Sequence, residues 1–210
     1  MDLLTLSKIT SLWSFRRELF WVSLAFLLTL SLPIVAVFLL TNLGISFVSD
    51  RLAKLDETTH IITLFYPNGT VFKELTLTTK WPVDGIITCE FGQIDLPYTI
   101  FHTGIDIANP EGKIGDPVAA FMPGKVIFAG EEKGGLGRYV VVDNGNYITS
   151  FYGHLSQILV VKGEEVTQTS RVIGLEGQSG TATGSHLHFQ IDVFGIPVNP
   201  RIFLGSGNPK

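Results

Sequence analysis

A long uncharged segment near the N-terminus constrains the fold of this chain more than any other feature. No Asp, Glu, Lys or Arg occurs from Leu19 to Ser49, and residues 19–40 are almost entirely apolar. As an α-helix, residues 19–40 would extend about 33 Å, enough to cross the hydrocarbon core of a bilayer. We therefore predict that residues 19–40 form one transmembrane helix ahead of a separate folded domain.

Two other interpretations of this segment fit less well. A cleaved signal peptide has a shorter apolar core followed by a small-residue cleavage site, and no convincing site follows here. A buried helix of a soluble protein would show a polar face, which Ser23, Thr29 and Ser31 do not form. Pro33 is tolerated in a membrane-spanning helix. We expect an uncleaved signal anchor that holds the protein in the cytoplasmic membrane.

The charges that flank the apolar segment indicate its orientation. Lys8, Arg16 and Arg17 precede it, whereas Arg51 and Lys54 follow it. The positive-inside rule favours, by this small excess, a cytoplasmic segment at 1–18 and an extracytoplasmic C-terminal domain.

The remaining sequence predicts an all-β domain with antiparallel sheets. Residues 41–59 have no heptad pattern and are expected to form a membrane-proximal linker. Residues 60–80 predict a β-hairpin with its turn at Asn68 and Gly69, and Asn144 and Gly145 predict a second one. No long amphipathic helix is expected after residue 60.

Composition excludes some functions and leaves others open. The formal net charge of −4 gives no basic patch for nucleic acid, so no nucleic-acid partner is expected. The single cysteine, Cys89, cannot form an internal disulfide and is expected to be a small buried residue.

A strictly alternating segment at 185–193 carries two histidines. His186, His188, Gln190 and Asp192 fall on one face of the expected strand, and the residues between them are apolar. Because the apolar face must be buried, the register is fixed and the two imidazoles stand side by side on the other face. Polar residues on an open strand face would also explain the pattern, but histidine is a favoured zinc ligand.

Two further histidines lie in suggestive surroundings. His102 and Asp106 are four residues apart, so in an extended segment they project to the same face and could bind zinc. His154 ends the strand expected after the turn at Asn144 and Gly145. The glycine-rich run at 174–184 lacks the ending of a P-loop and leads into a strand, so we interpret it as a tight loop.

Three motifs together resemble the lysostaphin/LytM family of zinc endopeptidases. They are His-Thr-Gly-Ile-Asp at 102–106, Tyr-Gly-His-Leu at 152–155 and His-Leu-His-Phe at 186–189. Framework segments agree at 82–88, 91–92, 117–120 and 197–200. The resemblance covers about residues 81–204 and implies a LytM-like peptidase domain at 81–210.

The resemblance implies a role for each candidate residue. Zinc (Zn²⁺) would be bound by His102, Asp106 and His188, and His154 and His186 would be the catalytic pair that does not bind metal. Three protein ligands leave a position for water, as expected of a catalytic zinc site. Which of the two catalytic histidines is the general base stays open.

The function implied is hydrolysis of peptide bonds in peptidoglycan stem peptides or cross-links. Two alternatives remain: a non-catalytic module that binds the wall or activates a hydrolase, and an endopeptidase acting on glycine-rich extracytoplasmic proteins. The sequence names no activating partner. It departs from the family pattern at Cys89, where Ser is common, and at Ser185, where Pro is common. The segments expected to wall the groove are 93–101, 130–137 and 174–184.

Overall fold

The computed structural model describes residues 3–94, 101–205, 207 and 209. The chain divides into two compact units, residues 1–43 and 44–210, which are described separately. The helices and strands are α1 (Leu3–Leu52), β1 (Ala53–Asp56), β2 (Ile61–Phe65), β3 (Val71–Leu75), β4 (Ile86–Cys89), β5 (Ile105–Ala108), β6 (Pro117–Ala119), β7 (Gly124–Glu131), β8 (Arg138–Gly145), β9 (Ile148–Gly153), β10 (Gln157–Ile158), β11 (Glu165–Val166), β12 (Val172–Leu175), β13 (Leu187–Val193), β14 (Ile196–Val198) and α2 (Arg201–Leu204).

The first unit consists of helix α1 up to Leu43. Its stretch Arg16–Val37 has a mean hydropathy of 2.2 and is long enough to cross a membrane. Pro33 lies inside the helix. The stretch overlaps the predicted anchor at 19–40, and by length and composition a membrane anchor and a signal sequence both meet this criterion.

The segment expected to be a linker is structured over much of its length. Residues 44–52 are the end of α1 and belong to the second unit, where Ser49 and Leu52 are fully buried. Strand β1 follows immediately and pairs with β2 from Ala53↔Leu64 to Asp56↔Ile61. Burial of Leu52 and the pairing of β1 with β2 thus give residues 44–56 a defined structure, and the role of 41–59 as a membrane-proximal linker stays a prediction.

The predicted hairpin at 60–80 is present. Strands β2 and β3 pair antiparallel, with Ile62 opposite Leu75. Gly69 has φ 85° in the turn, a value that glycine adopts without strain. The Asn68 side chain accepts a hydrogen bond from the Thr70 amide at 3.0 Å. With β1, the hairpin forms a three-stranded sheet in the order β1-β2-β3.

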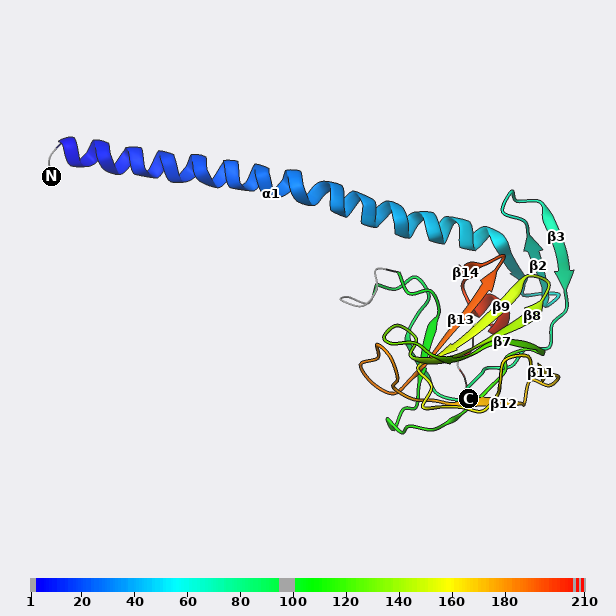
Figure 1. Ribbon diagram of the computed structural model, residues 1–210. Helices are drawn as coiled ribbons and strands as arrows, with labels where there is room; N and C mark the ends of the chain where they lie inside the picture. The colour runs from blue at the N-terminus through cyan, green and yellow to red at the C-terminus, as the bar shows by residue number, and fades with distance from the viewer. Residues whose placement is uncertain (1–2, 95–100, 206, 208, 210) are drawn as a thin grey trace. The chain divides into compact units, whose positions relative to one another are not determined.

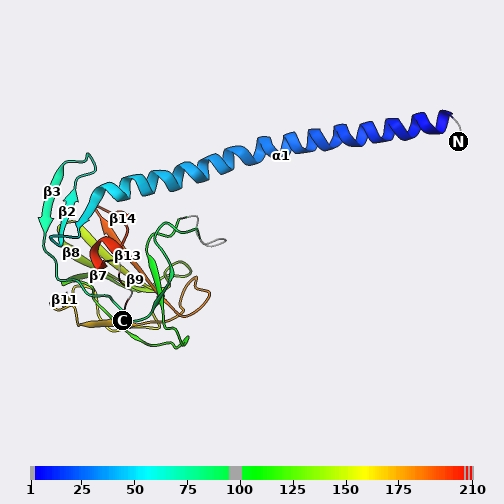
Figure 2. The same ribbon diagram turned by 180° about the vertical axis from the view of Figure 1, so that it is seen from behind.

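The predicted all-β, antiparallel architecture of the LytM-like domain is confirmed. The largest sheet runs in the order β11-β7-β8-β9-β13-β5-β4, with β14 also pairing with β13, and all its pairs are antiparallel. A smaller sheet has the order β10-β12-β6. The long strands β7, β8, β9 and β13 run side by side in both views (Figures 1 and 2).

Strand β13 lies inside the large sheet, between β9 and β5. Its alternating apolar residues are fully buried: Leu187, Phe189, Ile191 and Val193. The register predicted from alternation is therefore confirmed, and His188 projects to the opposite face, opposite Asp106 on β5 and Gly153 on β9.

The second predicted hairpin forms with its turn two residues later than expected. Strand β8 continues to Gly145, and the turn residues are Asn146 and Tyr147, with φ of 51° and 59°. Asn144 is instead buried, where its side-chain amide donates to the Met122 carbonyl at 3.2 Å and its oxygen accepts from Ser150 at 2.8 Å. These buried bonds hold Asn144 in the strand and displace the turn.

Candidate metal centre and catalytic cleft

A cleft of about 550 Å³ opens at the end of β13 that carries the paired histidines. All five residues predicted to form the site line it. The described lining residues are Thr88, Cys89, Gln93, Phe101, His102, Thr103, Asp106, Gly135, Leu136, His154, Thr181, Ala182, Thr183, His186 and His188. Residues 95–100, part of one expected groove wall, lie outside the described residues.

Three of these side chains meet at one point. His102 precedes β5, Asp106 lies on β5 and His188 lies on β13 directly opposite Asp106. His102 Nε2, Asp106 Oδ1 and His188 Nδ1 are each 3.0 Å from the other two atoms. All three residues are buried. The structure therefore brings together the three residues expected to bind metal.

The hydrogen bond of His102 to the backbone indicates which of its ring nitrogens carries the proton. Its Nδ1 lies 3.1 Å from the Glu90 carbonyl, which can only accept, so Nδ1 carries a proton. Nε2 then offers a lone pair toward Asp106 Oδ1, itself an acceptor. Two acceptors this close need a proton or a cation between them. Two imidazoles and one carboxylate are the ligand types that zinc prefers, so the residues fit a divalent metal.

Asp106 is held in its anionic form. Burial opposes its ionisation, but the polar contacts of the carboxyl group with the imidazoles of His102 and His188 outweigh burial and hold its pKa well below the usual range. The carboxyl group is therefore negatively charged near neutral pH.

Gly104, in the middle of the first motif, is required by close packing. A Cβ at this position would lie 2.3 Å from the Phe189 carbonyl oxygen and 3.0 Å from His188 Nε2. Any side chain would push the turn that carries His102 away from β13. The glycine thus sets the distance between the two histidines.

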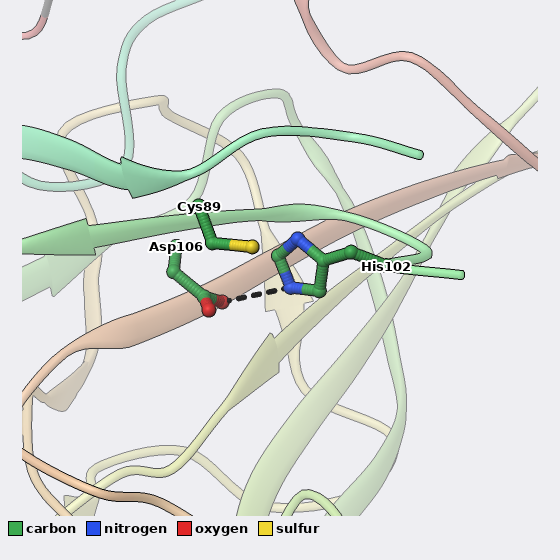
Figure 3. A group of neighbouring side chains, drawn as sticks. All are labelled: Cys89, His102 and Asp106. Atoms are coloured by element: carbon green, nitrogen blue, oxygen red, sulfur yellow. Dashed lines mark hydrogen bonds and ion pairs between the residues drawn. The ribbon is translucent and has the colours of Figure 1, made fainter. Parts of the chain in front are cut away.

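Cys89 lies beside His102 and Asp106, as Figure 3 shows. It pairs with Asp106 across β4 and β5, and its sulfur and ligand atoms of His102 and Asp106 all lie within 4.8 Å of one another. Cys89 is buried, as predicted from the sequence. Its place beside the site depends on pairing of β4 with β5, and no local motif signals this.

The two remaining histidines face the same cleft. The rings of His154 and His186 are 4.7 Å apart between centroids, and His186 Nε2 is 3.6 Å from Asp106 Oδ2. Nδ1 of His154 donates to the Ser179 carbonyl at 2.8 Å, and Nδ1 of His186 donates to the Gly184 carbonyl at 3.0 Å. Because the carbonyls can only accept, Nε2 of each neutral ring carries a lone pair.

His154 is kept neutral by its surroundings. Burial is the main cause that lowers its pKa to about 4, against the hydrogen bond to Ser179 that raises it. Its backbone has φ 61°, a left-handed conformation uncommon for a residue other than glycine. At neutral pH the side chain is therefore an unprotonated base held in one orientation.

Comparisons with known proteins agree with this geometry. Residues 100–200 match the description "Peptidase family M23". The peptidoglycan DD-endopeptidase ShyA of Vibrio cholerae is 44% identical over 112 residues, which is 52% of this chain and 25% of ShyA. The murein hydrolase activator NlpD of Salmonella typhimurium is 32% identical over 125 residues, 60% of this chain and 31% of NlpD. The chain thus spans less than a third of either curated relative.

A solved structure covers the same region more completely. The catalytic domain of the antimicrobial peptidase lysostaphin from Staphylococcus simulans is 30% identical and superposes with a TM-score of 0.52. The match covers 57% of this chain and 92% of that domain. The similarity includes the fold as well as the sequence.

Proposed function

The chain belongs to peptidase family M23, and from this premise we propose that it is a zinc metalloendopeptidase acting on peptidoglycan. One observation carries the proposal. Ligand atoms of His102, Asp106 and His188 converge at mutual distances of 3.0 Å beside two more histidines in one cleft. A module with a purely structural role has no need of this arrangement.

His102, Asp106 and His188 would hold the metal. The Glu90 carbonyl fixes the His102 ring so that Nε2 faces Asp106 and His188 with its lone pair, and Asp106 contributes negative charge. When bound, zinc supplies a Lewis acid that lowers the pKa of water to about 7 and polarises the scissile carbonyl.

His154 and His186 would move the protons of the reaction. Each presents an Nε2 lone pair while its Nδ1 is engaged by a backbone carbonyl. One imidazole would accept the proton of the attacking water on Nε2, and this protonated ring would then hydrogen-bond the developing oxyanion and give the same proton to the leaving amine. The other imidazole would orient the water by accepting a hydrogen bond from it. Since both rings have the same pattern of bonds, the distances alone favour neither for the role of base.

The relatives and the chain's organisation support the proposed substrate class. ShyA is named as a peptidoglycan DD-endopeptidase. In our proposal residues 19–40 anchor the protein in the cytoplasmic membrane and place the peptidase domain outside it, near newly inserted wall. Stem peptides or their direct cross-links are the expected substrates.

The alternative functions make different demands on the site. NlpD is named as a hydrolase activator, and a role of that kind needs neither metal nor a proton acceptor. All five site residues are present here, which supports catalysis. Cleavage of glycine-rich extracytoplasmic proteins would use the same chemistry on another substrate.

The test is digestion of purified peptidoglycan with zinc-loaded residues 44–210, the unit with its own core. We expect fragments whose masses show hydrolysis within stem peptides or cross-links. His188→Ala, matched in purification and zinc loading, should yield none. The activator role would be supported instead if the zinc-loaded wild type released no fragments by itself but increased the activity of a peptidoglycan hydrolase to which it was added.

A further inference from the structure

We propose that Ser185 and Glu176 are positioning residues for His186, acting through a partly buried hydrogen bond at the base of the loop 177–186. The inference rests on the proposed function, because it concerns one of the two histidines assigned to proton transfer. Neither residue lines the cleft among the described residues.

The loop 177–186 orients both catalytic histidines with its own backbone. The Ser179 carbonyl accepts from His154 Nδ1 at 2.8 Å, and the Gly184 carbonyl accepts from His186 Nδ1 at 3.0 Å. Any shift of the loop therefore turns an imidazole. The N-terminal arm of the loop carries Ser179, and the C-terminal arm carries Gly184. Each arm therefore orients one histidine.

The arm that carries Ser179 is fixed by contacts with the β7–β8 connection. The Ser179 hydroxyl accepts a hydrogen bond from the Arg138 amide at 2.8 Å. Gly180 packs so closely on Gly137 that a Cβ on either would lie 2.4 Å from backbone of the other segment. These contacts hold His154 and involve neither Ser185 nor Glu176.

The other arm is fixed at the base of the loop. The His186 amide donates to the Gly177 carbonyl at 3.0 Å, and these residues form an isolated β-bridge. Glu176 and Ser185 each precede one of the two bridge residues, and the Ser185 hydroxyl donates to Glu176 Oε1 at 2.9 Å. This side-chain contact thus crosses the bridge that carries His186.

Glu176 is a rigid partner for this contact. It is fully buried, and its backbone is held by the Asp116 carbonyl at 2.8 Å and the Ser156 hydroxyl at 2.7 Å. A buried carboxyl is destabilising unless hydrogen-bonded, and an apolar side chain would fill the space at lower free energy. What the carboxyl provides is a fixed acceptor for Ser185.

If each arm orients one histidine, a substitution in one arm should affect either His154 or His186 but not both, and one substitution in each arm tests this. Ser185→Ala removes the donor at the base, whereas Ser179→Ala removes the acceptor for Arg138 on the other arm. Ser185→Thr restores a hydroxyl at a partly exposed position. We would measure kcat and KM on a peptidoglycan peptide, zinc content, and the imidazole nitrogen signals by NMR, using the full zinc-loaded chain in detergent micelles.

We expect Ser185→Ala to lower kcat by about 10- to 100-fold, because small misplacements of a proton-transfer group have effects of this order. KM and zinc content should stay within about twofold. The His186 signals should shift while those of His154 stay in place, and Ser179→Ala should give the reverse. Ser185→Thr should restore kcat and the His186 signals.

Unchanged His186 signals in Ser185→Ala, or equal shifts of both histidines, would overturn the proposal. The NMR comparison needs no turnover, so it decides the positioning role even if the wild type hydrolyses no peptide. Failure of the wild type to bind zinc or hydrolyse any peptide would count against the proposed function alone. If Ser185→Ala does not fold, the Ser179→Ala and Ser185→Thr spectra still test the separation of the two arms.

Discussion

Replacing His154 with Asn should change how the stability of the domain depends on pH. Asn suits the site because it tolerates the left-handed backbone that His154 adopts at φ 61°. Asn cannot be protonated in the acidic range, so the variant isolates the effect of one imidazole. The measurement is the free energy of unfolding of metal-free residues 44–210, the unit with its own core.

The size of the effect follows from the burial of His154. Its pKa falls from 6.5 to about 4 in the folded state, chiefly because burial disfavours the charged ring. The unfolded chain therefore takes up the proton first as the pH falls. Stability associated with the neutral ring is complete above about pH 6.5 and is lost progressively down to about pH 4. At about 1.4 kcal/mol per pH unit, the loss is about 3 kcal/mol.

Urea unfolding from about pH 7.5 to about pH 4.5 measures this difference. The wild type should lose stability relative to His154→Asn as the solution is acidified, by up to about 3 kcal/mol. His60→Asn is the matched control, since His60 also has a left-handed backbone, at φ 55°, but is exposed. A difference between wild type and His154→Asn that does not vary with pH would refute the reasoning.

The other predictions concern metal, topology and substrate. His188→Ala should lose both zinc and activity, whereas His186→Ala should lose activity but keep most of the zinc; equal zinc loss, measured by metal analysis, would contradict the assigned roles. The mature protein should keep its N-terminus, and protease added outside the membrane should digest residues 81–210; a mature form that starts after residue 40 would contradict the anchor. The soluble domain should cleave a directly cross-linked muropeptide dimer faster than pentaglycine, and the reverse order of rates would contradict the substrate assignment.

The sequence of a single segment was sufficient to predict its structure where the pattern of apolar and turn residues within that segment determines the strand or the turn. The alternation at 185–193 predicted both the strand and the face on which His186 and His188 stand, because only one register buries the apolar side chains. The hairpin at 60–80 was predictable for a similar reason, since its turn residues favour the conformation that they adopt.

Features that depend on distant contacts were not predictable from local sequence. Asn144 looks like a turn residue, but its bonds to Met122 and Ser150 bury it in β8. The order of residues 44–56 depends on burial of Leu52 and on pairing of β1 with β2. The place of Cys89 beside Asp106 likewise needs the β4–β5 pairing.

The convergence of the metal-binding candidates depends on the position of β13 in the sheet. Its neighbours on the two sides are β5, with Asp106, and β9, which ends next to His154, and His188 pairs with both at the same level. A slip of one residue in the β13–β5 register would turn one of the facing side chains to the opposite side of the sheet. The apolar face of β13 prevents that slip by requiring burial of Leu187 and Phe189. The hydrophobic core therefore sets the geometry of the site as much as the histidines do.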